Sequence, residues 1–320
     1  MKGNLGKVLI GPIILLALIV AGCPGQERKP QEPDVQQRTQ VYKEEPTISL
    51  YINETQKTEK IKIEKYLEGV VAAEMDPKWP DNALAAQAIL ARTFTLKKIK
   101  DGGVKAHNTD ASTDVKEFQA YDPSRVNDKV REAVQATRGK VLVYQGEYIN
   151  GWFHADSGGI TASSAVEGLA YKKEKAPYIH SVKDPGFEIT VPENKAWTAV
   201  FSSSEVREAV KATIGNDPGD LHEASIVETG PSGRATIVKI NNVSLSAPAL
   251  RLALDNEKMR STLLEEFSVN DNSLLIRGKG YGHGVGMSQW GAKALADQGK
   301  KPEEIVRYWF KDVEIKNLWK

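Results

Sequence analysis

The single cysteine of this 320-residue chain limits the ways in which a fold can be stabilised. Cys23 has no second cysteine to pair with, so an intramolecular disulfide and a cysteine-based zinc site are both excluded. The folded part must therefore be held by a packed hydrophobic core. Hydrophobic residues make up 40% of the chain and charged residues 27%, which is ordinary for a globular protein of one large domain or two modest ones.

The position of Cys23 indicates export and lipidation. Residues 1–22 combine a basic start with an apolar stretch shorter than the roughly 20 residues that a bilayer-spanning helix needs. The segment Val20-Ala21-Gly22-Cys23 is typical of a lipobox, although leucine is usual where Val20 stands. We expect a signal peptide over 1–22 and a lipid on Cys23, the alternative being an uncleaved membrane anchor. Both place the rest of the chain outside the cytoplasm, at the outer face of the cytoplasmic membrane.

Residues 23–46 are predicted to form a flexible linker. The stretch is polar, holds four prolines and has almost no apolar residues to bury in a core. The whole chain is close to neutral, with 43 Lys and Arg against 42 Asp and Glu. This balance gives no reason to expect a nucleic acid partner.

Residues 47–320 are predicted to adopt an α+β fold with mainly antiparallel strands. Alternating apolar residues predict a strand over 47–52, and helical spacing predicts helices over 63–73 and 82–98, the second capped by Asn82. Further predicted elements are a helix over 126–136, a hairpin of strands 140–144 and 147–154, a helix from Ser204 to Ile214, two strands flanking 231–234, and helices near 288–298 and 302–310, which follow a glycine run over 278–286. A change of sequence texture indicates an inserted α+β subdomain over 185–267.

Glu74 is the first candidate for acid–base chemistry. It lies at the predicted end of the 63–73 helix, beside Met75 and close to Trp79. The partial negative charge of a helix C-terminus and desolvation by a tryptophan both favour a protonated carboxyl. Such a carboxyl can act as a general acid near neutral pH. The alternative is an ordinary solvated loop glutamate.

Glycine falls at every second position from 278 to 286. In an extended strand this spacing leaves one face as bare backbone, with Lys279, Tyr281, His283 and Val285 on the other. A bare face would let a sugar ring approach closely, while the alternative is a tightly packed structural strand. The run fits neither the dinucleotide-binding nor the Walker pattern, so it does not predict phosphate binding.

The segment 154–159 contains the Asp-Ser-Gly-Gly sequence that surrounds the nucleophile of trypsin-like serine proteases. A nucleophilic Ser157 would need a histidine and an aspartate upstream in suitable contexts, which His107 lacks. A glycine-rich loop after a strand explains the segment better. The five histidines show no i, i+4 pairing and no nearby cysteine, so we expect no metal and no cofactor.

Six segments together resemble the stage II sporulation protein D family, also called the SpoIID/LytB domain. They are 66–75 (YLEGVVAAEM), 83–93 (ALAAQAILART), 153–159 (FHADSGG), 231–234 (PSGR), 260–262 (RST) and 280–292 (GYGHGVGMSQWGA). Their order is preserved over roughly 45–315, and the first and last segments are long and specific.

The resemblance implies a lytic transglycosylase, which cleaves peptidoglycan glycan strands between N-acetylmuramic acid and N-acetylglucosamine and leaves a 1,6-anhydro end. The glutamate of the family's Glu-Met motif, here Glu74, is the implied catalytic acid/base. A hydrolytic glycosidase usually needs two carboxylates, whereas this lyase can use one, because the sugar's own 6-hydroxyl attacks. The residues expected in the glycan-binding groove are Gln87, Arg92, His154, Ser157, His283, Ser288 and Gln289.

The chain departs from the family pattern in one stretch. Some members bind zinc through Cys and His residues that precede a Gln-Val-Tyr-like segment, and 112–121 (STDVKEFQAY) contains neither. We therefore expect no zinc. The lipobox is a second difference, because many members use a transmembrane anchor.

The main alternative is a non-catalytic, peptidoglycan-binding enhancer of a cell-wall amidase, a role also attached to this family. It predicts glycan binding with a replaceable Glu74. By family analogy, the expected partners are peptidoglycan glycan strands, a cell-wall amidase and a membrane anchor complex, and the expected setting is engulfment during sporulation. Related domains also occur outside sporulation, so the resemblance leaves that setting open.

Overall fold

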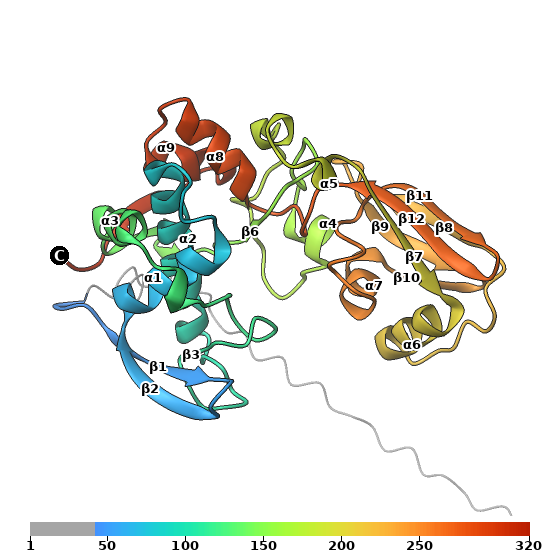
Figure 1. The fold of residues 1–320 in the computed structure, drawn as a ribbon, viewed down its shortest axis with the longest axis horizontal. Coiled ribbons are helices and arrows are strands. Elements are labelled where there is room, and N and C mark those ends of the chain that lie inside the picture. Colours follow the sequence, from blue (N-terminus) through green and yellow to red (C-terminus); the bar gives the residue numbers. More distant parts are fainter. Residues whose placement is uncertain (1–41) are drawn as a thin grey trace, which may run out of the picture. The chain divides into compact units, whose positions relative to one another are not determined.

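The chain enters its fold beside the C-terminal strand. A computed structural model describes residues 42–320 (Figure 1); the predicted signal peptide, Cys23 and the linker up to residue 41 lie outside the described residues. Tyr42 donates its backbone N–H to the Leu318 carbonyl at 3.0 Å, and Glu45 pairs with Arg138 at 2.6 Å. The last residues of the predicted linker thus contact the folded part.

Helices and strands alternate irregularly along the chain (Figure 1). The helices are α1 (Ile63–Glu74), α2 (Asp81–Lys100), α3 (Asp128–Ala136), α4 (Ala165–Leu169), α5 (Pro192–Lys195), α6 (Ser203–Ile214), α7 (Ala247–Ala253), α8 (Gln289–Asp297) and α9 (Pro302–Trp309), with the 3-10 turns η2 (Pro123–Arg125) and η3 (Pro185–Glu188). The strands are β1 (Thr47–Ile52), β2 (Lys57–Lys62), β3 (Ala111–Ser112), β4 (Lys140–Tyr144), β5 (Glu147–Tyr148), β6 (Phe153–His154), β7 (Trp197–Ser202), β8 (Ala224–Thr229), β9 (Ala235–Ile240), β10 (Val243–Ser246), β11 (Leu263–Asn270), β12 (Ser273–Lys279), β13 (Met287–Ser288) and β14 (Glu314–Asn317).

The strands form several small sheets, ordered β2-β1-β3, β14-β4-β5, β13-β6, β11-β12-β7 and β10-β9-β8. Most pairings are antiparallel; β1 with β3 and β6 with β13 are parallel. The predicted α+β class with mainly antiparallel strands is therefore confirmed.

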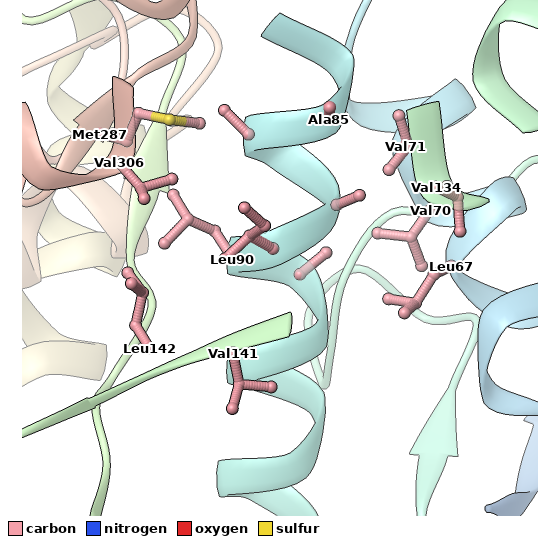
Figure 2. Packing of buried hydrophobic residues seen from close by; sticks show 14 of the residues in the cluster. Leu67, Val70, Val71, Ala85, Leu90, Val134, Val141, Leu142, Met287 and Val306 are labelled. Carbon is pink, nitrogen blue, oxygen red and sulfur yellow. The ribbon is translucent and has the colours of Figure 1, made fainter. Parts of the chain in front are cut away.

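The alanine-rich helix α2 lies at the centre of the first hydrophobic core. Its small side chains let neighbours pack closely, and it is buried on nearly all sides from Ala83 to Leu96. Figure 2 shows α2 between two groups of apolar side chains, Leu67, Val70 and Val71 of α1 on one side and Leu142, Met287 and Val306 on the other. Each fully buried side chain of this kind contributes about 1.5–3 kcal/mol to folding. Because α1 and the segment around β13 pack on the same helix, they hold fixed positions relative to α2.

A second hydrophobic core is built from β7, α6, β9, α7 and β12, with Phe201, Val210 and Ile276 at its centre. Helix α6 begins with a reciprocal capping box between Ser202 and Glu205, so Ser202 is the N-cap and the prediction of Ser204 was wrong by two residues. The predicted limits of an inserted subdomain, 185 and 267, stay a prediction.

Several predicted elements are confirmed. The strand over 47–52 and the helices over 63–73 and 126–136 are β1, α1 and α3. The strands flanking 231–234 are β8 and β9, and the last two helices begin after Ser288 and at Pro302, as expected. Asn82, by contrast, is not a cap: it lies inside α2, whose N-cap is Pro80, and its side chain donates to the Lys300 carbonyl.

The predicted hairpin strand over 147–154 is broken. Strand β4 pairs with β5 only as far as Tyr148, and β6 pairs with β13 instead. Gly151 explains the break, because the chain there runs against α2 so closely that a Cβ would lie 2.9 Å from the Leu90 carbonyl oxygen. The chain must leave the hairpin to pass α2.

The glycine run after β12 is not the extended strand that its alternation predicted. Strand β12 ends at Lys279, and Gly282 and Gly284 have φ angles of 112° and 77°, which glycine adopts at no steric cost. A Cβ on Gly282 would overlap the His154 side chain, and one on Gly284 would overlap the Arg234 guanidinium. The glycines therefore give the backbone room to approach these two side chains, and the bare strand face was a wrong prediction.

Candidate active site

Glu74 is the last residue of α1, and its side chain is partly exposed. Its Oε1 accepts a hydrogen bond from the backbone N–H of Ala120 at 3.0 Å. Ala120 follows Gln119, which is buried and donates from Nε2 to Thr95 on α2 at 3.0 Å. The carboxyl is thus held at one oxygen while remaining reachable from solvent.

Burial raises the pKa of Glu74 to about 7, while the Ala120 N–H and the side chain of Gln289 oppose the rise. Near neutral pH the carboxyl is therefore found in both its protonated and its ionised form. The helix end contributes less than the sequence suggested, because Arg125 donates to the carbonyls of Ala73 and Met75 at 3.2 and 3.4 Å and offsets their partial charge. Desolvation by burial is therefore the main cause of the raised pKa of Glu74.

Gln289 is the predicted groove residue that lies beside Glu74. It is the first residue of α8, 7% exposed, and its side chain lowers the pKa of Glu74. Its Nε2 has no hydrogen bond of regular geometry among residues 42–320. The contact with Glu74 is therefore loose, and because Nε2 is itself buried, the amide acts on the carboxyl from the protein side.

Two tryptophans lie close in sequence to this pair of residues, and Trp290 was not among the predicted site residues. Trp79, in the loop after Glu74, meets Trp290 of α8 with ring centroids 4.8 Å apart, and both remain partly exposed. Lys129 fixes the loop by donating to the Trp79 carbonyl at 3.0 Å. Aromatic faces of this kind can bind the apolar face of a sugar ring. The sequence signal that could have identified Trp290 is its position directly after Gln289 in the family segment 280–292.

His154 and His283 form a second group, with ring centroids 5.5 Å apart. Nδ1 of His283 accepts from the Val285 N–H at 3.0 Å, while Nδ1 of His154 lies 3.2 Å from the Val285 carbonyl oxygen and therefore carries its proton. Burial and then the charges of Arg251 and Arg234 lower the pKa of His283 to about 3, and burial also lowers that of His154. Both rings are neutral at physiological pH, so neither supplies a charge.

Ser288 connects this group to Gln289. Its backbone pairs with that of His154 through β6 and β13, and its side chain caps α8 by accepting from the Gly291 N–H at 3.1 Å. Ser288 is fully buried. Its position indicates that it sets where α8 begins, and hence where Gln289 lies, and that it does not touch a ligand itself.

Ser157 is also fully buried, and its hydroxyl donates to Asp184 at 2.6 Å. The backbone N–H of Ser157 donates to the same carboxylate at 3.2 Å. The structure therefore gives Ser157 an aspartate as its partner, in place of the histidine that a protease nucleophile needs. Its predicted contact with glycan is not compatible with this burial.

The structure gives Arg92 a structural role in place of the predicted groove contact. Arg92 has no exposed surface. It donates two hydrogen bonds to the Glu64 carboxylate, from Nε to Oε1 at 3.1 Å and from Nη2 to Oε2 at 2.5 Å. Gln87, the next candidate on the same helix, is fully buried as well, and neither of its amide atoms has a hydrogen-bond partner within the described part of the chain. The structure thus brings Gln289 to Glu74, joins His154, His283 and Ser288, and leaves Arg92 and Ser157 in internal networks.

Within residues 42–320, no group of three or more His, Cys, Asp or Glu side chains is arranged to hold a metal ion. The same residues contain no helix with the length and apolar character needed to cross a bilayer.

Several known proteins are similar to this chain in sequence. The family model described as stage II sporulation protein matches residues 51–144, which include Glu74. The stage II sporulation protein D of Bacillus subtilis (strain 168) is 30% identical over 283 residues, which cover 84% of this chain and 78% of that protein. The chain belongs to the stage II sporulation protein D family. A domain of unknown function matches residues 183–286, which include His283.

Two other proteins are also similar to this chain. An uncharacterised protein of Brachyspira hyodysenteriae (strain ATCC 49526 / WA1) is 34% identical over 80% of this chain and 67% of its own length. A protein of Bacillus subtilis (strain 168) called amidase enhancer is 28% identical over 76% of this chain and 39% of its own length. These relatives thus carry different names, and this chain matches different shares of their lengths.

Proposed function

We propose that this family member is a lytic transglycosylase that cleaves peptidoglycan glycan strands, with sporulation as its setting. The observation that carries the proposal is the Glu74 carboxyl, which is partly exposed, has a pKa near 7 and lies beside the Gln289 side chain. A group that is protonated in a large fraction of molecules, yet ionises readily, suits a residue that must donate a proton and then accept one.

The reaction needs only this carboxyl and the substrate. Protonated Glu74 donates its proton to the glycosidic oxygen while the bond from that oxygen to C1 of the N-acetylmuramic acid breaks. The 6-hydroxyl of the same sugar then forms a bond to C1, and the Glu74 carboxylate takes its proton, which restores the starting state. Attack within one ring supplies the orientation that a second reactant would otherwise need. The Ala120 N–H stabilises the transient carboxylate through its bond to Oε1.

No second acid is required, and the nearest in sequence is not placed to help. Asp76 is exposed, and its Oδ1 accepts from the Lys78 N–H at 2.9 Å in the loop after α1. A hydrolytic glycosidase usually sets two carboxyl groups across the bond that it cuts. A lone acid/base therefore favours the anhydro-forming reaction over hydrolysis.

The products decide between these reactions. Purified peptidoglycan, intact and after removal of stem peptides by an amidase, is incubated with the protein and the fragments are analysed by mass spectrometry. We expect fragments with 1,6-anhydro-N-acetylmuramic acid ends. Reducing ends would mean hydrolysis and would contradict the single-carboxyl mechanism.

A non-catalytic role has one specific observation in its favour, namely the relative called amidase enhancer. In that role the protein would bind glycan and raise the rate of an added amidase without cutting either substrate. The same digestion, repeated with an amidase and without one, separates the two functions, because only the enzyme produces new glycan ends by itself.

The lipid anchor on Cys23 remains part of the proposal, since it would hold the site at the outer face of the cytoplasmic membrane, where glycan strands lie. Growth of producing cells with an alkyne-tagged palmitate should label the wild-type protein and leave Cys23→Ser unlabelled. Equal labelling of both would remove the anchor from the proposal.

A further inference from the structure

A cavity of about 740 Å³ is lined by four lysines that the proposed reaction does not use. Lys172, Lys173 and Lys175 come from one loop, and Lys311 follows α9; we call these four the lysine pocket. None of them forms an ion pair with any side chain in residues 42–320. Since the whole chain carries a net charge of only +1, four unpaired cations around one cavity are a local concentration of charge.

The one acid in the lining does not neutralise the lysines. Glu174 pairs with Lys97 of α2 at 3.4 Å, and one of its oxygens accepts from the side chain of Asn150. Its carboxylate is therefore committed to α2 and to the segment after β5. The charge of Lys311 is felt nearby, where it adds to burial in lowering the pKa of His180.

The loop that carries the lysines is held at both ends. At its start, Tyr171 packs edge-on against Trp152 with ring centroids 5.0 Å apart. At its end, the Tyr178 hydroxyl accepts from the Asn150 N–H at 2.9 Å, and the Tyr178 carbonyl accepts from the Lys311 N–H at 3.0 Å. The lysines thus keep a defined arrangement around the cavity, whereas charges on a free loop would separate to reduce their repulsion.

We propose that the lysine pocket binds the phosphodiester groups of a linear anionic polymer. The ammonium groups of lysines act on phosphate as point charges, whereas the planar guanidinium of an arginine is the better match for a carboxylate. The lining of the lysine pocket includes no arginine. Charges spread around a cavity of this size suit several phosphates in succession. A flat bilayer would reach only the rim of a concave surface. The inference does not depend on the chemistry of Glu74.

Binding of a glycerol phosphate oligomer to the full chain, measured by calorimetry at low and at physiological salt, tests the proposal. The variant Lys172→Gln/Lys173→Gln/Lys175→Gln should bind roughly tenfold more weakly, because each surface ion pair contributes modestly and three are lost. The matched control is Lys57→Gln/Lys60→Gln/Lys116→Gln, which removes the same charge from three other exposed lysines and should keep its affinity. Equal losses in both variants would reduce the effect to net charge and overturn the proposal.

Other ligands identify the source of the anion. Vesicles containing phosphatidylglycerol, polyglutamate and inorganic phosphate are tested with the same three proteins. Pocket-dependent binding that is tighter to vesicles or to polyglutamate than to the oligomer would overturn the assignment to a phosphodiester polymer. Inorganic phosphate should bind much more weakly than the oligomer, and equal affinity per molecule would contradict the polymer. Release of anhydro fragments from peptidoglycan free of phosphate polymers should be the same for all three proteins, so failure of the pocket is distinguishable from failure of the enzyme.

Discussion

Replacing Glu74 with glutamine is expected to slow glycan cleavage by between about a hundredfold and ten thousandfold, the range that general acid–base catalysis usually supplies. Glutamine keeps the size of the side chain and an oxygen that can accept the Ala120 N–H, but it cannot give up or take a proton. The measurement is the initial rate at which anhydro ends form from amidase-treated peptidoglycan. Glycan binding should change little.

The control for this variant is Asp76→Asn, two residues along the chain. Asp76 is exposed, and asparagine can still accept the Lys78 N–H, so the rate should stay within about twofold of wild type, as for most surface substitutions. A Glu74→Gln protein that cleaves as fast as Asp76→Asn would exclude Glu74 as the acid/base and would favour the amidase-enhancing role.

Both the activity and the stability of the protein should depend on pH through the ionisation of Glu74. Since the first step needs the protonated carboxyl, kcat/KM should fall as the pH rises through about 7. The pKa of Glu74 is raised above its ordinary value of 4.5, so its contribution to stability is fully present below about 4.5 and is lost as the pH rises through about 7. Thermal unfolding should therefore show Glu74→Gln to be more stable than wild type at alkaline pH. If Glu74→Gln were inactive and also less stable than wild type at alkaline pH, its loss of activity would be attributed to damage to the fold.

The parts of the fold that follow from periodicity could be predicted from the sequence. Helix α1 and strand β1 repeat their apolar residues at 3.6 and 2 positions, and both have the expected bounds within a residue. Chain direction after Tyr148 could not be predicted, because the break there depends on how closely Gly151 approaches α2. The glycine alternation was misread for the same reason, since spacing alone does not tell which side chains will occupy the room that glycine leaves.

The sequence named its candidate site residues from family segments, and it could not show where burial decides the role of a residue. Glu74 came from its motif, yet its raised pKa depends on burial by residues distant in sequence. Ser157 and Arg92 are polar residues in matching segments, so the sequence placed them in a groove. Their partners, Asp184 and Glu64, are 27 and 28 residues away, and only the folded chain shows that these pairs are internal.

Replacing Arg92 with methionine is expected to lower the free energy of unfolding by about 3–5 kcal/mol, the usual cost of removing one partner of a buried ion pair. Methionine fills much of the space but leaves the Glu64 carboxylate buried, with the Gly139 N–H and the Trp319 indole N–H, each at 3.0 Å, as its remaining donors. Arg92 also donates to the Lys140 carbonyl at 3.0 Å, so one hydrogen bond between α2 and β4 is lost as well. Urea unfolding followed by circular dichroism measures the change.

The double variant Arg92→Met/Glu64→Met shows whether the loss comes from the stranded charge. Because it removes both members of the pair, it should be destabilised by clearly less than the sum of the two single variants. The control on the same helix as Glu64 is Lys65→Met, which breaks the exposed Lys65–Glu68 pair and should cost at most about 1 kcal/mol. An Arg92→Met protein that unfolds like wild type but no longer binds glycan would contradict this structural role, because a residue without exposed surface should affect binding only through the stability and shape of its surroundings.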